Sequence, residues 1–296
     1  MGNNRFFSEA NRPIGLQTYT LGDEIVADIP AGFARIAAIG YRELQLSGLY
    51  DQTPEALAAA ASDAGLTITS LHLAVSTRGN APGLSLASPV QEIVDAMGTL
   101  GAQRAVLPIL AFPDDMKPRE GEGVQAMIGR SILEAGPDLW KRTAALLNEK
   151  GALLKPEGIS LGYHNHNMEF APLGKTTGWD ILVDETEKDL VEFELDVGWV
   201  AAAGLDPAAL VASLAGRVSI LHVKDLTAST KPNYALSMQS TEVGAGIQDW
   251  PTILVAAEKA GVRHYYVEQE PPFAIPRFEA ITRSFQYLSA LRVPAA

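Results

Sequence analysis

The chain has 296 residues, of which 47% are hydrophobic, and its formal net charge is −12. This length suits one large α/β barrel, since such barrels commonly run to roughly 250 residues or more. The acidic balance, without any cluster of Lys and Arg, argues against nucleic acid and anionic membranes as partners. The chain has no cysteine, which excludes disulfides, thiolate metal ligands and a cysteine nucleophile.

The expected location is the cytoplasm. No apolar stretch approaches the ~20 residues needed to cross a bilayer. The N-terminal sequence MGNNRFFSEANRPIG lacks the charged-then-apolar plan of a secretory signal. We therefore expect a soluble protein whose partner is a small, neutral or weakly anionic molecule.

Short apolar runs alternate with helix-like segments along the whole chain. Eight runs are predicted as strands, in chain order Ile14–Tyr19, Tyr41–Leu46, Thr67–Leu73, Arg104–Ile109, Ile159–His164, Val191–Asp196, Val218–Val223 and Tyr265–Gln269. Helical periodicity between them is seen in Thr53–Ala64, Asp138–Lys150, Asp206–Leu214, Trp250–Ala260 and Arg277–Leu291. Eight strands that alternate with helices predict a single (β/α)8 TIM barrel over residues 1–296. A doubly wound open sheet is the alternative, but no Gly-x-Gly-x-x-Gly follows the first strand.

One segment interrupts this alternation of strands and helices. Residues 112–136 (FPDDMKPREGEGVQAMIGRSILEAG) are long and polar for a connection between a strand and a helix. The segment follows the fourth strand, on the face where barrel active sites lie. It is interpreted as a lid or substrate loop, with an ordinary surface excursion as the alternative.

Alternation of side chains along each strand predicts which residues face the barrel interior. In the fifth strand Ile159, Leu161 and Tyr163 form the apolar, helix-facing set, so His164 points inward. The same reasoning, applied to the other strands, gives an inward set of polar or charged residues that includes Glu43, Gln45, Ser47, Ser70, His72, Glu192, Glu194, Asp196, His222, Lys224, Glu268 and Glu270.

These inward residues gather near the C-terminal ends of the strands. Burying a charged group costs several kcal/mol unless it is paired or binds a metal. Imidazoles and carboxylates that converge on one mouth therefore indicate a cation, although any single one could be a satisfied polar core group. Without cysteine, the set suits one divalent metal ion: Mn, Mg, Co, Fe or Zn.

Seven segments carry a resemblance to a known family. They are IGLQTYTL, GYRELQLSGLY, GLTITSLH, LGYHNHNMEF, FELDVGWVAAAGLDP, RVSILHVKD and YYVEQEPPF, which span residues 14 to 273 in order. The chain resembles the sugar phosphate isomerase/epimerase family, the xylose isomerase-like TIM barrels. That resemblance implies a metal held by Asp196 of ELDVGW, His222 of LHVKD and Glu268 of VEQE.

The fourth ligand is where the chain departs from its relatives. Ketose 3-epimerases carry a Glu on the fifth strand, whereas this chain has His164 at about that place, followed by His166 and Glu169. Strand parity favours His164, with His166 second, and leaves Glu169 as a base or a substrate contact. Trp199 stands where those epimerases have a substrate-binding His, and Gln45 stands where many relatives have Glu.

The chemistry implied by the resemblance is proton abstraction beside a carbonyl of a sugar or keto-sugar. Glu169 and Glu270 are the candidate bases. Lys224 would stabilise the developing oxyanion, or would form a salt bridge to Glu194 or Asp225. Substrate contacts are predicted for His72, Gln45, His166 and Trp199.

Several functions remain open on this basis. The leading hypothesis is a sugar isomerase or epimerase, and the alternative is a lyase: a dehydratase of keto-inositols, or an enzyme that cleaves 3-keto-glycosides. A barrel nuclease for abasic DNA is disfavoured by only five histidines and the charge of −12. A non-catalytic sugar-binding barrel is a further class. The resemblance also suggests a homodimer.

Overall fold

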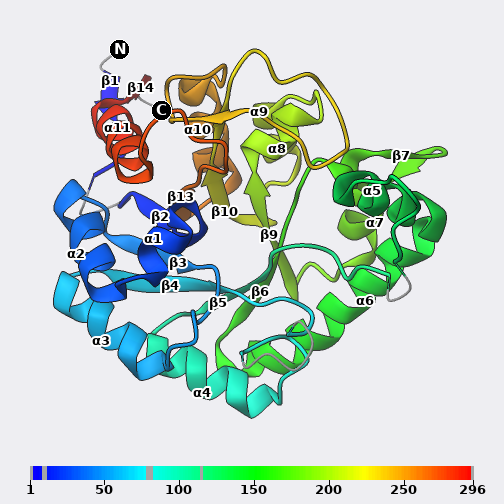
Figure 1. Cartoon of the computed structure of the whole chain (residues 1–296), viewed down its shortest axis with the longest axis horizontal. Coiled ribbons are helices and arrows are strands. Elements are labelled where there is room, and N and C mark those ends of the chain that lie inside the picture. The colour runs from blue at the N-terminus through cyan, green and yellow to red at the C-terminus, as the bar shows by residue number, and fades with distance from the viewer. Residues whose placement is uncertain (1–2, 9–11, 78–82, 114–115, 295–296) are drawn as a thin grey trace.

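The computed structural model describes residues 3–8, 12–77, 83–113 and 116–294. Within these ranges the strands of the central sheet are all parallel and close into a barrel, which Figure 1 shows end-on with the helices around it. The eight barrel strands are β2 (Gly15–Gln17), β3 (Glu43–Leu46), β4 (Thr67–His72), β5 (Arg104–Leu107), β6 (Ser160–His164), β9 (Val191–Asp196), β10 (Val218–Val223) and β13 (His264–Val267). They neighbour one another in chain order, and β13 pairs with β2 to close the ring.

The (β/α)8 TIM barrel predicted from the sequence is therefore confirmed. Strands β9 and β10 have the predicted bounds. The others are shorter by one or two residues at one end or both, except that β13 begins one residue earlier and ends two residues earlier than predicted. The largest difference follows β2, where the expected strand residue Tyr19 lies in a 3-10 turn, η1 (Thr18–Leu21). The side chain of Gln17 accepts a hydrogen bond from the Tyr19 backbone at 3.1 Å, and this bond turns the chain out of the sheet.

The helices form the outer layer, with the apolar faces of the longer ones packed on the strands. Their bounds are α1 (Asp23–Val26), α2 (Ile29–Ile39), α3 (Pro54–Ala64), α4 (Val90–Leu100), α5 (Val124–Ala135), α6 (Pro137–Leu154), α7 (Gly178–Glu185), α8 (Val197–Ala202), α9 (Pro207–Ser213), α10 (Trp250–Ala260) and α11 (Arg277–Ala290). Capping residues fix several of the starts. Thr53, Asp206 and Asp249 each accept a hydrogen bond from the first turn of the helix that follows.

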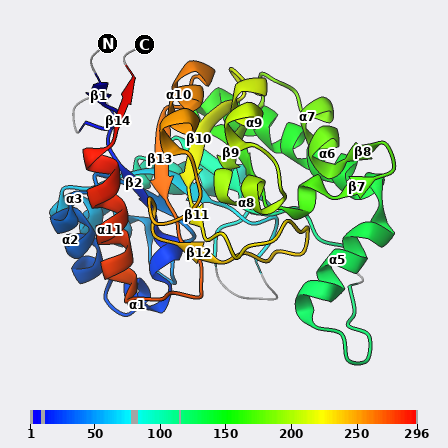
Figure 2. The same ribbon diagram turned by 90° about the horizontal axis from the view of Figure 1, so that it is seen from above.

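The polar segment 112–136 contains α5, a helix that we did not predict, and its residues 114 and 115 lie outside the described ranges. Figure 2 shows α5 projecting beyond the ring, on the side that carries the hairpin of β11 (Asp225–Leu226) and β12 (Ser240–Thr241). The amide of Gln125 on α5 donates to the carbonyl of Leu236, in the connection between these two short strands. The segment is thus linked to the loop that follows β10.

Two further pairs of short strands lie outside the barrel. Strands β7 (Pro172–Leu173) and β8 (Thr176–Thr177) form a hairpin before α7. Strands β1 (Asn3–Arg5) and β14 (Arg292–Pro294) pair antiparallel, which brings the chain ends together at the edge of the barrel (Figure 2).

Candidate metal centre

Four side chains with metal-ligating atoms meet at the C-terminal end of the barrel. His164 ends β6, Asp196 ends β9, His222 lies near the end of β10, and Glu268 follows β13 directly. One ligand atom from each lies within 4.8 Å of the others. None of these residues is more than 5% exposed. The structure thus brings together the three residues given by the resemblance and the fifth-strand group favoured by parity.

Asp196 uses its two carboxylate oxygens for different purposes. Oδ1 accepts the backbone N–H of Trp199 at 3.0 Å and so caps α8. Oδ2 is buried without a directed hydrogen bond, although the ammonium of Lys224 lies 2.7 Å away. An incompletely satisfied carboxylate oxygen, buried beside two imidazoles, fits a site built for a divalent cation.

Lys224 contacts three carboxylates at the mouth. Its Nζ lies 2.7 Å from Asp196, 2.9 Å from Glu268 and 2.6 Å from Glu270. The salt bridges predicted to Glu194 or Asp225 are wrong, because the side chain turns towards the strand ends rather than into the barrel or the following loop. Gly198 permits this path, since an added Cβ there would stand 2.7 Å from Cγ of Lys224.

A second polar layer lies beneath the first. Oε1 of Glu194 is 2.8 Å from His72 Nε2, 3.0 Å from His164 Nδ1 and 2.9 Å from His222 Nε2. Gln45 is fully buried here and bonds to Glu194, and its contact with a substrate stays a prediction. Ligand atoms of His72, His164, Glu194 and His222 also lie within 4.8 Å of one another. The sequence placed Glu194 in the interior but did not identify it as a site residue.

Burial and neighbouring charges shift the pKa values in opposite directions. Burial lowers the pKa of His164 to about 4. Burial also acts to lower that of His222, but Glu194 and Glu268 outweigh it and raise the pKa to about 10. Burial raises the pKa of Asp196 to about 6, against the lowering effect of Lys224. A cation at the mouth would relieve the repulsion between Asp196 and Glu268.

His166 and Trp199 lie beside the cluster rather than in it. The His166 ring is 5.0 Å from that of His164 and 5.2 Å from that of Trp199. Neither His166 Nδ1 nor Trp199 Nε1 has a hydrogen-bond partner among the described residues. Trp199 is 2% exposed and packs against Met238 of the loop after β10.

The two asparagines of the HNHN segment position other elements. Asn165 accepts the backbone N–H of Asp196 at 2.9 Å, which fixes the end of β9. Asn167 donates to the backbone oxygen and the side-chain oxygen of Asn233, and accepts the N–H of Leu236, each near 2.9–3.0 Å. Sequence reasoning missed both roles. No strand alternation could have signalled them, because β6 ends at His164 and both asparagines lie beyond it.

Glu169 is separated from the proposed ligands. Its Oε1 accepts the hydroxyl of Tyr163 at 2.7 Å, and Tyr163 belongs to the helix-facing core. Its Oε2 is buried without a partner, and burial raises the pKa of Glu169 to about 7. No contact joins it to the four clustered side chains among the described residues.

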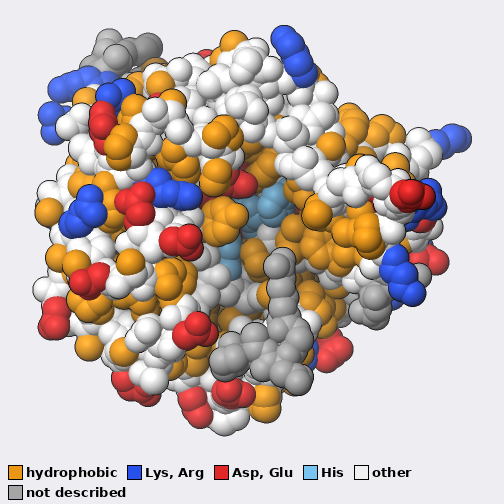
Figure 3. Space-filling view, viewed as in Figure 1, with side chains coloured by type: hydrophobic (Ala, Val, Ile, Leu, Met, Phe, Trp, Pro, Cys, Tyr) orange, Lys and Arg blue, Asp and Glu red, His pale blue; other side chains and the backbone are white. Residues whose placement is uncertain are grey.

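Glu270 reaches the mouth. Its carboxylate contacts Lys224, and its side chain is 23% exposed. Together with Trp199, Gln125 and loop residues 236–239 it lines a cavity of about 220 Å³. Figure 3 shows histidine side chains at the bottom of a hollow in this face, with acidic side chains beside them and hydrophobic ones around.

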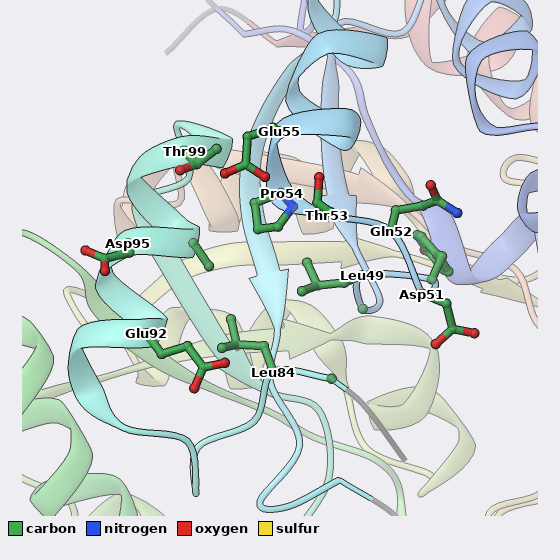
Figure 4. A pocket seen from close by; sticks show the side chains of 14 residues that line it. Leu49, Asp51, Gln52, Thr53, Pro54, Glu55, Leu84, Glu92, Asp95 and Thr99 are labelled. Atoms are coloured by element: carbon green, nitrogen blue, oxygen red, sulfur yellow. The ribbon is translucent and has the colours of Figure 1, made fainter.

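A larger cavity, of about 1060 Å³, shares no lining residue with the cluster. Figure 4 shows its lining, which comes from the loop before α3, the start of α3, the loop before α4 and one side of α4. Its acidic side chains are Asp51, Glu55, Glu92 and Asp95. No predicted site residue lines it, so its size does not make it the site.

Among the described residues, no helix is both long and apolar enough to span a membrane.

The chain is 27% identical over 188 residues to an inosose dehydratase of Lacticaseibacillus casei. The match covers 58% of this chain and 62% of that enzyme, so the chain spans less than two thirds of the enzyme's length. Two structures described as sugar phosphate isomerase/epimerase from Parabacteroides distasonis superimpose on nearly the whole chain. One is 26% identical to this chain, with a TM-score of 0.72 over 98% of both chains. The other is 22% identical, with a TM-score of 0.75 over 95% of this chain and 99% of its own.

One family model matches most of the chain. The model of the xylose isomerase-like TIM barrels matches residues 33–291, which include all four clustered side chains. This chain belongs to the xylose isomerase-like TIM barrel family.

Proposed function

We propose that the chain is a divalent-metal-dependent sugar isomerase or epimerase that moves a proton beside the carbonyl of a sugar or keto-sugar. The observation that carries this proposal is the convergence of two imidazoles and two carboxylates from four strand ends within 4.8 Å. When bound there, a divalent ion would polarise the substrate's oxygen atoms as a Lewis acid.

Glu270 is the best-placed proton acceptor. Its carboxylate is outside the proposed ligand set and lines the cavity at the mouth, whereas that of Glu194 lies in the inner layer. Lys224, 2.6 Å away, would stabilise negative charge that develops on the substrate oxygen. Burial acts to lower the pKa of Lys224, but Asp196, Glu268 and Glu270 raise it well above its usual value, so the side chain is an ammonium.

The arrangement favours chemistry that needs a single base. Inverting a carbon requires proton transfer on both faces of the substrate, and a second base would have to stand across the site from Glu270. On the β6 side the structure has His164 and His166, whereas Glu169 is buried and bonded to Tyr163. Aldose–ketose isomerisation, in which one base can return the proton to the neighbouring carbon, therefore fits better than two-base epimerisation.

A second candidate is a dehydratase, favoured by the sequence match to inosose dehydratases. In that reaction Glu270 would take the proton next to the carbonyl. The electron pair of the C–H bond would form the double bond, the neighbouring C–O bond would break, and Lys224 would supply the proton with which the hydroxyl leaves as water.

One incubation distinguishes these reactions. The Mn²⁺-loaded protein is mixed in D₂O with ketohexoses, aldohexoses and an inosose. Deuterium beside the carbonyl in an isomerised or epimerised product supports the first function, and an unsaturated, ultraviolet-absorbing product supports the second. Glu270→Gln should lose turnover in either case and keep its metal. No deuterium exchange and no product with any of these substrates would contradict both.

A further inference from the structure

Each imidazole of the proposed ligand set has two nitrogens that face different carboxylates. His164 Nδ1 lies 3.0 Å from Glu194 Oε1, while its Nε2 lies 3.9 Å from Asp196 Oδ2. His222 Nε2 lies 2.9 Å from the same oxygen of Glu194, and its Nδ1 is 2.7 Å from Glu268 Oε2. One nitrogen of each ring therefore faces inward to Glu194, and the other faces the mouth.

Gln45 fixes the direction of these inward hydrogen bonds. Its Nε2 donates to Ser70 Oγ at 2.7 Å and to the second oxygen of Glu194. Its Oε1 must then accept, and it lies 2.6 Å from Gln17 Nε2 and 2.6 Å from His222 Nε2. Because both neighbours of His222 Nε2 are acceptors, that nitrogen carries the hydrogen, and Nδ1 is left for the mouth.

We propose that Glu194 is a positioning residue for the metal centre: it accepts the inward N–H of His164 and His222 and so aims their other nitrogens at one ion. The inference rests on the proposed function, because it takes the mouth cluster as the metal site. A carboxylate behind a ligating imidazole fixes the ring's orientation and tautomer, and losing such a partner typically weakens metal binding 10–100-fold.

The alternative role for Glu194 is that of a metal ligand. Together with His72, His164 and His222 it could hold a second ion in the inner layer. Such an ion would need the nitrogen of His222 that donates to Gln45 and Glu194. The hydrogen bonds of Gln45 thus favour the positioning role, and the number of ions bound per chain distinguishes the two.

The test compares Glu194→Gln with a matched control, Glu192→Gln. Glu192 lies two residues earlier on the same strand and is predicted to face the same side. It forms an ion pair with Arg263 at 3.5 Å, and among the described residues no hydrogen bond or ion pair joins it to a histidine. Mn²⁺ affinity and stoichiometry are measured at one fixed pH by competition with a chelating dye. Wild type should bind one ion, Glu194→Gln one ion about 10–100-fold more weakly, and Glu192→Gln one ion with unchanged affinity.

A second readout does not depend on affinity. In the Zn²⁺-loaded, ¹⁵N-histidine-labelled wild type, NMR should show the hydrogen on Nδ1 of His164 and on Nε2 of His222. In Glu194→Gln, the hydrogens of His164 and His222 should be found on the other ring nitrogens or spread over both. Glu194→Asp keeps a carboxylate, which the amide variant lacks, and should recover part of the affinity. It tests the same point if the amide variant does not fold.

Three results would overturn the proposal. These are unchanged affinity in Glu194→Gln, two ions in wild type that fall to one in that variant, and equal losses in the Asp and Gln variants accompanied by equal thermal destabilisation. Absence of any Mn²⁺ or Zn²⁺ binding by wild type would instead overturn the proposed function on which the inference rests.

Discussion

Asp196 divides its carboxylate between a helix and the cluster. Oδ1 caps α8, and Oδ2 lies beside Lys224 and the histidines. This division means that one side chain serves both local structure and the proposed metal site. It also means that the two roles can be separated by substitution.

Asp196→Asn should keep the cap and lose the metal. An amide oxygen can still accept the Trp199 N–H, but the neutral side chain is a poorer cation ligand. We expect at least a tenfold loss of Mn²⁺ affinity. Asp196→Ala should lose the metal and be about 1 kcal/mol less stable than Asp196→Asn, because both variants lose the ion pair with Lys224 but only the alanine variant loses the cap. Wild-type Mn²⁺ affinity in Asp196→Asn would remove Asp196 from the ligand set.

Glu169 offers a test by pH. Its folded-state pKa is raised to about 7 by burial, above the ordinary value of 4.5. The folded state therefore holds a proton that the unfolded state releases, so its contribution is fully present below pH 4.5 and is lost as pH rises towards 7. Glu169→Gln should remove this loss, by an amount on the order of 3 kcal/mol at most.

The measurement is urea unfolding of wild type and Glu169→Gln between pH 4.5 and 8. The variant should gain stability relative to wild type across this range and level off above pH 7. Its turnover should be retained, because Glu169 contacts Tyr163 rather than the cluster. A constant stability difference over the range would contradict the buried-carboxyl account, and lost turnover would restore Glu169 as a candidate base.

At the scale of elements, α8 controls where Lys224 lies. The helix passes so close that only glycine fits at position 198, where a Cβ would stand 2.7 Å from Lys224 Cγ. Gly198→Ala should displace the ammonium and lower turnover roughly 10–100-fold, as small misplacements at active sites do. Gly98→Ala on α4, where nothing lies within 4 Å of the added Cβ, is the matched control. Equal turnover in both variants would show that the position of Lys224 is unimportant.

The loop after β10 is held from two sides. The carboxylate of Asp225 accepts the backbone N–H groups of Gly244, Gly246 and Gln248. Asn167 bonds to Asn233 and Leu236 at the other end of the loop. Because Leu236 and Met238 line the cavity with Trp199, these bonds shape one wall of the mouth.

Asn167→Ala should loosen that wall without removing a proposed ligand. We expect a higher KM, faster proteolysis within residues 227–239 and unchanged Mn²⁺ affinity. Asn148→Ala is the control, since Asn148 likewise joins two segments, through Glu185 and Glu187, but on α6 away from the mouth. If proteolysis and KM in Asn167→Ala match those of the control, the hydrogen bonds of Asn167 do not shape the mouth.

The elements differ in how far sequence could predict them. The predicted bounds of β9 and β10 match the structure. In β9 apolar and polar side chains alternate throughout, whereas β10 is an apolar run in which Ile220 and Leu221 stand side by side. Helix α5 was missed, since its segment is polar and its buried contacts are few. Parity also gave His164, whereas the partner of Lys224 depends on how a flexible side chain packs against Gly198, which no periodicity records.

At the scale of the whole molecule, the barrel gathers ligand-type side chains from residues 164 to 268 onto one face. The net charge of −12 adds to the attraction of this face for cations. A metal that binds only the folded chain would stabilise it by RT ln(1 + [L]/Kd), about 2.7 kcal/mol at a concentration of 100 Kd. Binding of the metal therefore raises the free energy of unfolding of the whole barrel.

The most direct test of the central claim is calorimetric titration of metal-free protein with Mn²⁺, on wild type and on His222→Ala and Glu268→Gln. The account predicts one ion per chain for wild type and loss of that binding in both variants, with the barrel's circular dichroism spectrum retained. Binding at full occupancy in either variant, or no binding by wild type, would contradict it.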